Sequence, residues 1–208
     1  MWEFIVKGGP LMALIILCSV IAFAVFIERI WHLRRARIDT DRFVKSILEL
    51  IKYNKIMEAI DKCNNTPGPI AHIMKMGILK HDRTREEIRE SIQDAGVHEV
   101  PRLEKNLGVL ATIAHISPLL GLLGTVTGMV KAFQVIEQKA VSMIPVNPGD
   151  LAGGIWESLI TTVAGLTVAI PTYVVYNYLV NKVDGFVLEI EKSATELVNI
   201  LAAKRETG

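Results

Sequence analysis

The chain has 208 residues, of which 50% are apolar and 22% are charged, and its formal net charge is +1. This balance argues against the basic surface that nucleic-acid binding proteins carry, and we expect no nucleic-acid partner. The apolar residues gather in three blocks, each long enough for an α-helix that crosses about 30 Å of hydrocarbon. These blocks exclude a soluble helical protein, and without strand-like alternation they predict an all-α integral membrane protein with three transmembrane helices.

The first apolar block runs from Leu11 to Ile27 without a charge. We assign the first span to residues 11–31, after an N-terminal segment of residues 1–10. A cleaved signal peptide is the alternative for so short an N-terminal block. We favour a retained span, because the positive charge follows the apolar run and no A-x-A site closes it.

The basic residues predict the orientation of the chain. Sixteen of the 23 lysines and arginines lie between Arg29 and Lys105. Four of them lie at the exit of the first span: Arg29, Arg34, Arg35 and Arg37. Basic residues near span ends stay in the cytoplasm. We therefore expect a periplasmic N-terminus, a cytoplasmic region over residues 32–106 and a cytoplasmic C-terminus.

The cytoplasmic region has the pattern of a series of amphipathic helices. Asp39 can cap a helix with an apolar stripe at helical spacing: Phe43, Val44, Ile47, Leu48 and Ile51. A second short helix must end at the turn residues 64–69, and a third follows them. Thr84 and Glu87 form a capping box, which opens a long helix that continues into the second span with a kink at Pro101.

The second span is assigned to residues 107–130, followed by a periplasmic loop over 131–147. Asn147 before Pro148 is a typical helix start, so the third span covers 148–180. Residues 181–208 then form a cytoplasmic C-terminal helix. Helices 2 and 3 thus extend beyond the membrane into the helical cytoplasmic region.

Glu157 is the acid of the third span. It lies nine residues into the helix, roughly 13 to 14 Å at about 1.5 Å per residue, which is near the middle of the bilayer. A charged side chain there costs about 2.5 to 3.5 kcal/mol and often marks an ion path. Burial favours the neutral form of carboxyl groups, and a group that gains and loses a proton suits a relay. Alternatively, Glu157 snorkels to the outer interface or bonds to a neighbouring helix.

Small and hydroxyl residues accompany this acid. One face of the second span has Ser117, Gly121, Gly124 or Thr125, and Gly128 at helical spacing. The third span contributes Thr161, Thr162, Gly165 and Pro171. Small residues allow close helix contact or leave room beside a pore, and hydroxyls can solvate a proton or a cation. Packing alone is the alternative for each of them. His115 also lies in a span, but near its cytoplasmic end, and we leave it outside the site.

Two segments resemble the MotA/TolQ/ExbB proton-channel family. The first comprises Leu110–Ala114, Ser117–Met129 and Ala132-Phe133. The second comprises Leu151–Thr162, Gly165-Leu166, Ala169–Pro171 and Tyr176-Asn177. The order of spans and the long cytoplasmic loop are similar as well. His115 and Pro101 stand where the family usually has other residues.

The resemblance implies a function and a set of partners. An ExbB- or TolQ-like subunit forms a homopentamer around ExbD- or TolR-like single-span partners, each with an intramembrane Asp. It energises a TonB- or TolA-like protein that acts on the outer membrane. Glu157 would be the pore acid, with Thr125 and Thr162 as the pore threonines and Thr161 beside them. The resemblance implies no cofactor, no metal and no enzymatic activity.

Two other readings remain open. A membrane scaffold that gathers partner helices would conduct nothing. An intramembrane enzyme is disfavoured, because the chain has no GxSxG elbow, no HExxH pair and no second intramembrane carboxylate. A carboxylate with hydroxyls serves H⁺ or Na⁺, and the absence of further intramembrane acids favours H⁺.

Overall fold

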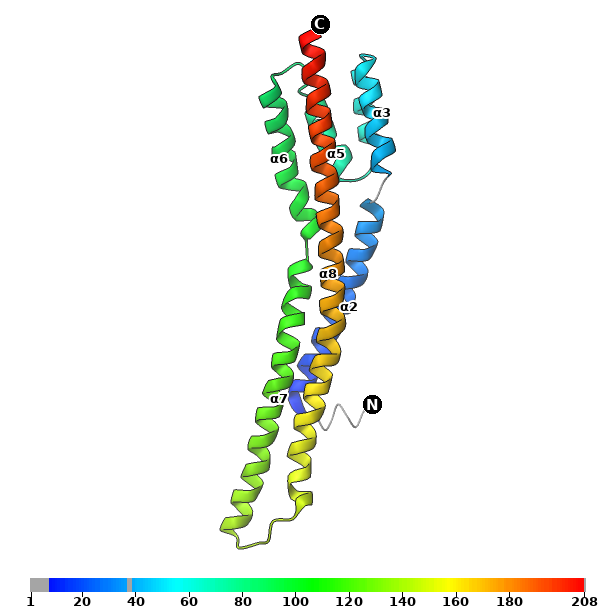
Figure 1. Cartoon of the computed structure of the whole chain (residues 1–208). Helices are drawn as coiled ribbons and strands as arrows, with labels where there is room; N and C mark the ends of the chain where they lie inside the picture. The colour runs from blue at the N-terminus through cyan, green and yellow to red at the C-terminus, as the bar shows by residue number, and fades with distance from the viewer. Residues whose placement is uncertain (1–7, 37–38, 208) are drawn as a thin grey trace. The chain divides into compact units, whose positions relative to one another are not determined.

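The computed structural model describes residues 8–36 and 39–207. Over these residues the chain forms helices and connecting turns, with no strand (Figure 1). The helices are α2 (Gly9–Ala36), α3 (Thr40–Lys52), α4 (Ile56–Asn65), α5 (Pro69–Ile78), α6 (Arg85–Glu104), α7 (Leu107–Val141) and α8 (Pro148–Thr207). Three helical stretches are long and apolar enough to cross a membrane, which confirms the predicted fold class. Arg37 and the N-terminal residues 1–7 lie outside the described residues.

The chain divides into two compact units. One contains α2 up to Ile27 together with Asn106–Tyr178, and we call it the membrane unit. The other contains Glu28–Lys105 and α8 from Leu179 onward, and we call it the helical unit. Helices α2 and α8 contribute residues to both.

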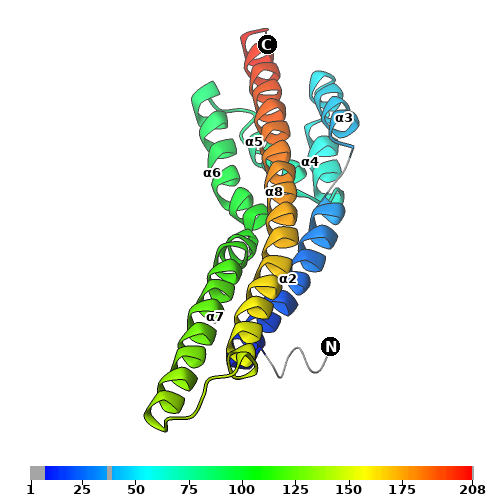
Figure 2. The same ribbon diagram turned by 60° about the horizontal axis from the view of Figure 1, so that its bottom comes forward.

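In the membrane unit, α7 and the first half of α8 run side by side in opposite directions, joined by a short loop (Figures 1 and 2). Many outward-facing side chains of this pair are large and apolar: Leu119, Leu122, Val126, Phe133, Leu159, Val163 and Ile170. Such a surface is stable against lipid or a partner helix and unfavourable in water.

Helix α7 is longer than the predicted span. Its 35 residues extend to Val141, so most of the expected loop 131–147 is helical. The segment is rich in Ala, Gln, Glu and Lys, which are strong helix formers, so its charges end the apolar block without ending the helix. At about 1.5 Å per residue, α7 is roughly 52 Å long and exceeds the hydrocarbon thickness.

The start of α8 confirms the prediction at Asn147 and Pro148. The helix begins at Pro148, and the Asn147 N–H donates to a carboxylate oxygen of Asp150 at 2.8 Å. In return, the Asp150 N–H donates to the Asn147 carbonyl at 3.0 Å. The loop therefore enters the helix with its backbone groups satisfied.

In the helical unit, the predicted amphipathic helices are confirmed. The expected stripe of α3 is buried, and α3, α4, α5 and α6 pack successively against one another (Figure 2). The side chain of Leu197 of α8 is fully buried and lies against Gly77 of α5. The capping box is present, because the Thr84 hydroxyl accepts from the Glu87 N–H at 3.2 Å and the Thr84 N–H donates to Glu87 at 2.9 Å.

The helical unit also buries Arg29, a basic residue that directly follows the first apolar block. The Arg29 side chain is 2% exposed, and its guanidinium donates to Glu28 at 2.7 Å. Nearby, Arg102 pairs with the buried Glu99 at 2.9 Å. In each pair the buried charge, Arg29 or Glu99, has an ionic partner at the protein surface.

The structure corrects one expectation about the helix that leads into the second span. We expected it to run without interruption past a kink at Pro101, but α6 ends at Glu104 and α7 begins at Leu107. Asn106 between them has φ 63°, in the left-handed region. Pro101 removes one backbone hydrogen bond near the end of α6, and Asn adopts left-handed backbone more readily than most residues. Together these two residues explain the break.

Candidate ion pathway

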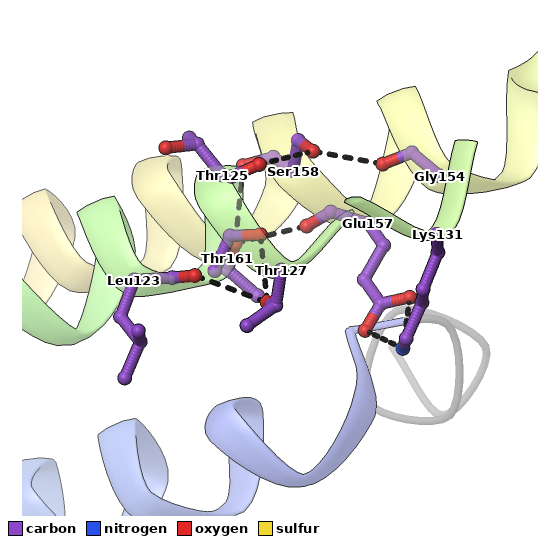
Figure 3. Close-up of polar contacts among 9 residues, drawn as sticks. Leu123, Thr125, Thr127, Lys131, Gly154, Glu157, Ser158 and Thr161 are labelled. Atoms are coloured by element: carbon purple, nitrogen blue, oxygen red, sulfur yellow. Dashed lines mark hydrogen bonds and ion pairs between the residues drawn. The ribbon is translucent and has the colours of Figure 1, made fainter. Parts of the chain in front are cut away.

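The Glu157 carboxylate forms an ion pair with Lys131. Glu157 lies in the third turn of α8 and Lys131 on α7, and the Lys131 Nζ donates to both carboxylate oxygens at 2.5 and 2.7 Å (Figure 3). The Glu157 side chain is 14% exposed, and that of Lys131 is 52% exposed. The acid is therefore held in the protein, while the lysine stem remains accessible.

The pair lies against the start of α2. Gly9 has φ +64°, and a Cβ atom there would meet Oε1 of Glu157 at 2.5 Å. In Figure 3, the side chains of Glu157 and Lys131 point toward the beginning of α2. A residue without a side chain is thus required at position 9, and residues of three helices surround the carboxylate.

The small residues of α7 are in direct contact with α8. A Cβ at Gly121 would meet Thr162 Cα at 3.0 Å, and Gly124 lies directly against the Thr161 side chain. Gly128 faces Ser158, while Gly165 of α8 faces the Ser117 carbonyl. Each of these glycines brings two helix backbones close together. The structure thus assigns them to packing between α7 and α8, and a pore-lining role for them stays a prediction.

The hydroxyl groups of the three candidate threonines donate hydrogen bonds to backbone carbonyls of α7 and α8. Thr161 is fully buried and donates to the carbonyls of Glu157 and Ser158 at 2.9 and 3.0 Å. Thr162 donates to the Gly121 carbonyl at 3.2 Å, and Thr125 donates to the Leu122 carbonyl at 2.6 Å. In the part of the chain that the structure describes, no threonine hydroxyl is hydrogen-bonded to the Glu157 carboxylate.

The structure separates Thr125 from the acid. Figure 3 places Thr125 on the side of the α7 and α8 pair away from α2, whereas Glu157 points toward α2. Ser158 lies between the two helices and donates to the Thr125 carbonyl at 3.1 Å. Within one subunit, the predicted pathway residues therefore share a helix pair without forming a single polar cluster.

Pro171 and His115 lie far from Glu157. Pro171 is 14 residues further along α8, roughly 21 Å, and lines an apolar cavity of about 240 Å³ with Ala22 and Phe26 of α2. The protonated Nδ1 of His115 donates to the Ala111 carbonyl at 2.7 Å. The His115 ring meets that of Tyr173 edge to face, with centroids 6.5 Å apart. Both residues belong to the other end of the membrane unit.

Lys131 is the residue that sequence reasoning missed. Charges mark the end of an apolar block, and this rule places Lys131 in the loop after the second span. The stripe of small residues at 117, 121, 124 and 128 continues by three residues to Lys131, on the face that contacts α8. Extending this stripe beyond the apolar block would have found the partner of Glu157.

Comparison with known proteins agrees with this architecture. Residues 65–192, more than half of the chain, match the sequence model of the MotA/TolQ/ExbB proton channel family. The chain belongs to this family. The match includes α7 and α8 as far as Lys192, and therefore both residues of the ion pair.

Curated relatives have names from two branches of the MotA/TolQ/ExbB family. A putative biopolymer transport protein ExbB homolog of Methanothermobacter thermautotrophicus is 28% identical over 91% of this chain and 66% of its own length. A putative ExbB-like protein of Synechocystis is 31% identical over 82% of this chain and 80% of its own. The Tol-Pal system protein TolQ of Pseudomonas aeruginosa is 25% identical over 100% of this chain and 95% of its own. The chain spans just under two thirds of the first of these relatives.

Proposed function

We propose that this chain is the ion-conducting stator subunit of a motor in the bacterial inner membrane, which couples the proton motive force to work on the outer membrane. Membership of a proton channel family supports this function. The observation that carries the proposal is Glu157, an ionisable side chain 14% exposed in a helix long enough to cross a membrane. Such an acid is unfavourable in a protein that only packs against lipid, and it marks a candidate ion path.

The physical basis of the motor is the energy of an ion crossing the membrane. Each elementary charge releases about 2.3 kcal/mol per 100 mV. In this proposal, Glu157, Thr125, Thr161 and Thr162 carry the ion through the assembled channel. A hydroxyl that donates to a carbonyl still offers its oxygen as an acceptor, so the threonines can solvate a passing proton.

The orientation of the chain is part of the proposal. The N-terminus is periplasmic and the C-terminus cytoplasmic, as the sixteen basic residues between Arg29 and Lys105 favour. Helix α7 then runs outward, and Lys131 lies toward its periplasmic end. The pair with Glu157 would accordingly receive ions from the periplasmic side.

The partners follow from the relatives. Curated relatives include biopolymer transport proteins ExbB and Tol-Pal system proteins TolQ. We propose an ExbB-like role that energises TonB-dependent import, in a homopentamer that encloses ExbD-like single-span helices with an intramembrane Asp. A TolQ-like role with TolR- and TolA-like partners in envelope integrity is the alternative, which the full-length similarity to a TolQ protein supports.

The test is Glu157→Gln, which keeps the size and hydrogen bonding of the side chain but cannot ionise. Glu137→Gln on the exposed surface of α7 is the matched control. We expect Glu157→Gln to abolish import of iron complexes driven by the ion gradient, or detergent resistance if the role is TolQ-like, and the control to retain both. A non-conducting scaffold predicts that Glu157→Gln is tolerated, and full activity of this variant would reject the proposal.

A further inference from the structure

Lys131 occupies both oxygens of the Glu157 carboxylate. The two distances of 2.5 and 2.7 Å describe a tight, charge-assisted pair between α7 and α8. Gly9 of α2 lies against the same carboxylate. The position where an incoming cation would meet Glu157 is therefore already taken by an ammonium group of the same chain.

In the described part of the chain, one other acidic group lines the same cavity as the pair, and it has a partner of its own. Lys131, Asp150 and Glu157 line one open cavity of about 600 Å³ at this end of α7 and α8. The charge of Asp150 is matched by Lys139, which lies 2.5 Å away. From α2, the described residue that faces the carboxylate is Gly9, which has no side chain. Among the described residues, Lys131 is thus the cation that faces Glu157.

The exposures of the two side chains are unequal. Glu157 is 14% exposed and Lys131 is 52% exposed, so the lysine can withdraw along its flexible stem while the acid stays in place. A proton that arrives on Glu157 leaves Lys131 as an unpaired charge, which is unfavourable unless the ammonium reaches a polar environment. Pairing with Lys131 and loading of an ion therefore exclude one another.

We propose that Lys131 is the positioning residue for Glu157: it holds the carboxylate turned toward α2, and it must be displaced before Glu157 accepts a travelling ion. This inference rests on the proposed function and adds a regulatory residue to the same site. It predicts that removal of the Lys131 ammonium leaves both carboxylate oxygens of Glu157 open to an incoming ion or reagent.

The experiment measures how readily a carboxyl reagent reaches Glu157. The full-length protein in proteoliposomes is treated at pH 7 with dicyclohexylcarbodiimide, which modifies carboxyl groups in membranes, and labelling of the Glu157 peptide is followed over time by mass spectrometry. Glu157→Gln sets the background. Lys131→Gln removes the charge, Lys131→Arg retains it, and Lys139→Gln breaks the neighbouring ion pair with Asp150 as the matched control. Thermal unfolding confirms that each variant is folded, and Lys131→Asn replaces the Gln variant if that one is not.

We expect Lys131→Gln to raise the rate of Glu157 labelling at pH 7 by about tenfold or more, because its side chain no longer donates a charge-assisted pair to both carboxylate oxygens. Lys131→Arg and Lys139→Gln should label as the wild type does. The same labelling curve for Lys131→Gln and wild type would overturn the inference. Labelling needs no transport, so this result, together with loss of transport in Glu157→Gln, would reject the role of Lys131 and leave the proposed function standing.

Discussion

Gly124 of α7 lies directly against the side chain of Thr161 of α8, with no space for even a methyl group between them. Thr161 is fully buried and β-branched, so it cannot rotate away. This contact sets the distance between the two helices that carry Lys131 and Glu157.

Gly124→Ala should therefore destabilise the protein. An alanine normally stabilises a helix by about 1 kcal/mol relative to glycine, but overpacking at a buried contact costs about 1 to 3 kcal/mol. Gly153→Ala is the control, because a Cβ there meets nothing within 4 Å. Thermal unfolding in detergent should show a lower Tm for Gly124→Ala and an unchanged or higher Tm for Gly153→Ala. Equal or higher stability of Gly124→Ala would contradict the close contact.

The break between α6 and α7 depends on the left-handed backbone of Asn106. With φ 63°, Asn106 has a left-handed backbone, which Asn tolerates because its short polar side chain can hydrogen-bond locally. Asn106→Ala keeps the Cβ and loses those hydrogen bonds, so it should destabilise the protein by up to about 1 to 2 kcal/mol. Asn106→Gly has no Cβ and should be tolerated better. Unfolding midpoints of the two variants in detergent check the order, and an alanine variant as stable as the glycine variant would indicate a continuous helix at this position.

Cys63 of α4 should be an unreactive thiol. Burial raises its pKa from 9.0 to about 11, an effect that Lys75 only partly opposes. In a Cys18→Ser background, alkylation of Cys63 by iodoacetamide at pH 8 should be at least about tenfold slower in the folded protein than after unfolding in detergent, because the thiolate is the nucleophile. Equal rates would show that the thiol is exposed.

The raised pKa of Cys63 also makes the free energy of unfolding depend on pH. Below pH 9 the thiol is protonated in both states, so the stability of the helical unit is unaffected there. Between pH 9 and about 11 the unfolded chain ionises first, and stability falls as pH rises. The Cys63→Ala variant should lose this part of the pH dependence, measured as Tm between pH 8 and 10.5. If the Tm of Cys63→Ala falls with rising pH as steeply as that of the wild type, the prediction is wrong.

Much of this architecture follows from residue patterns. The three apolar blocks, the stripe of α3 and the capping box at Thr84 depend on local periodicity and local hydrogen bonds, which single sequences encode directly. The helix start at Pro148 belongs to the same class.

The structure differs from the sequence-based predictions where the end of an apolar block is not the end of a helix. Charge at Lys131 ends the apolar block, yet the helix continues to Val141, since Lys, Glu and Gln favour helices as strongly as many apolar residues do. The break at Asn106 depends on one backbone angle, which a helical stripe does not reveal. The partner of Glu157 lies 26 positions away in the sequence, and only the packing of α7 on α8 brings the two residues together.

The most direct test of the account is proton flux through the assembled channel. Proteoliposomes that contain this chain and the proposed single-span partner are given a potassium diffusion potential, and internal pH is recorded for the wild type, Glu157→Gln and Glu137→Gln. The account predicts flux for the wild type and Glu137→Gln, and flux reduced to the level of empty liposomes for Glu157→Gln. Flux through Glu157→Gln equal to that of the wild type would contradict the claim that this acid carries the ion.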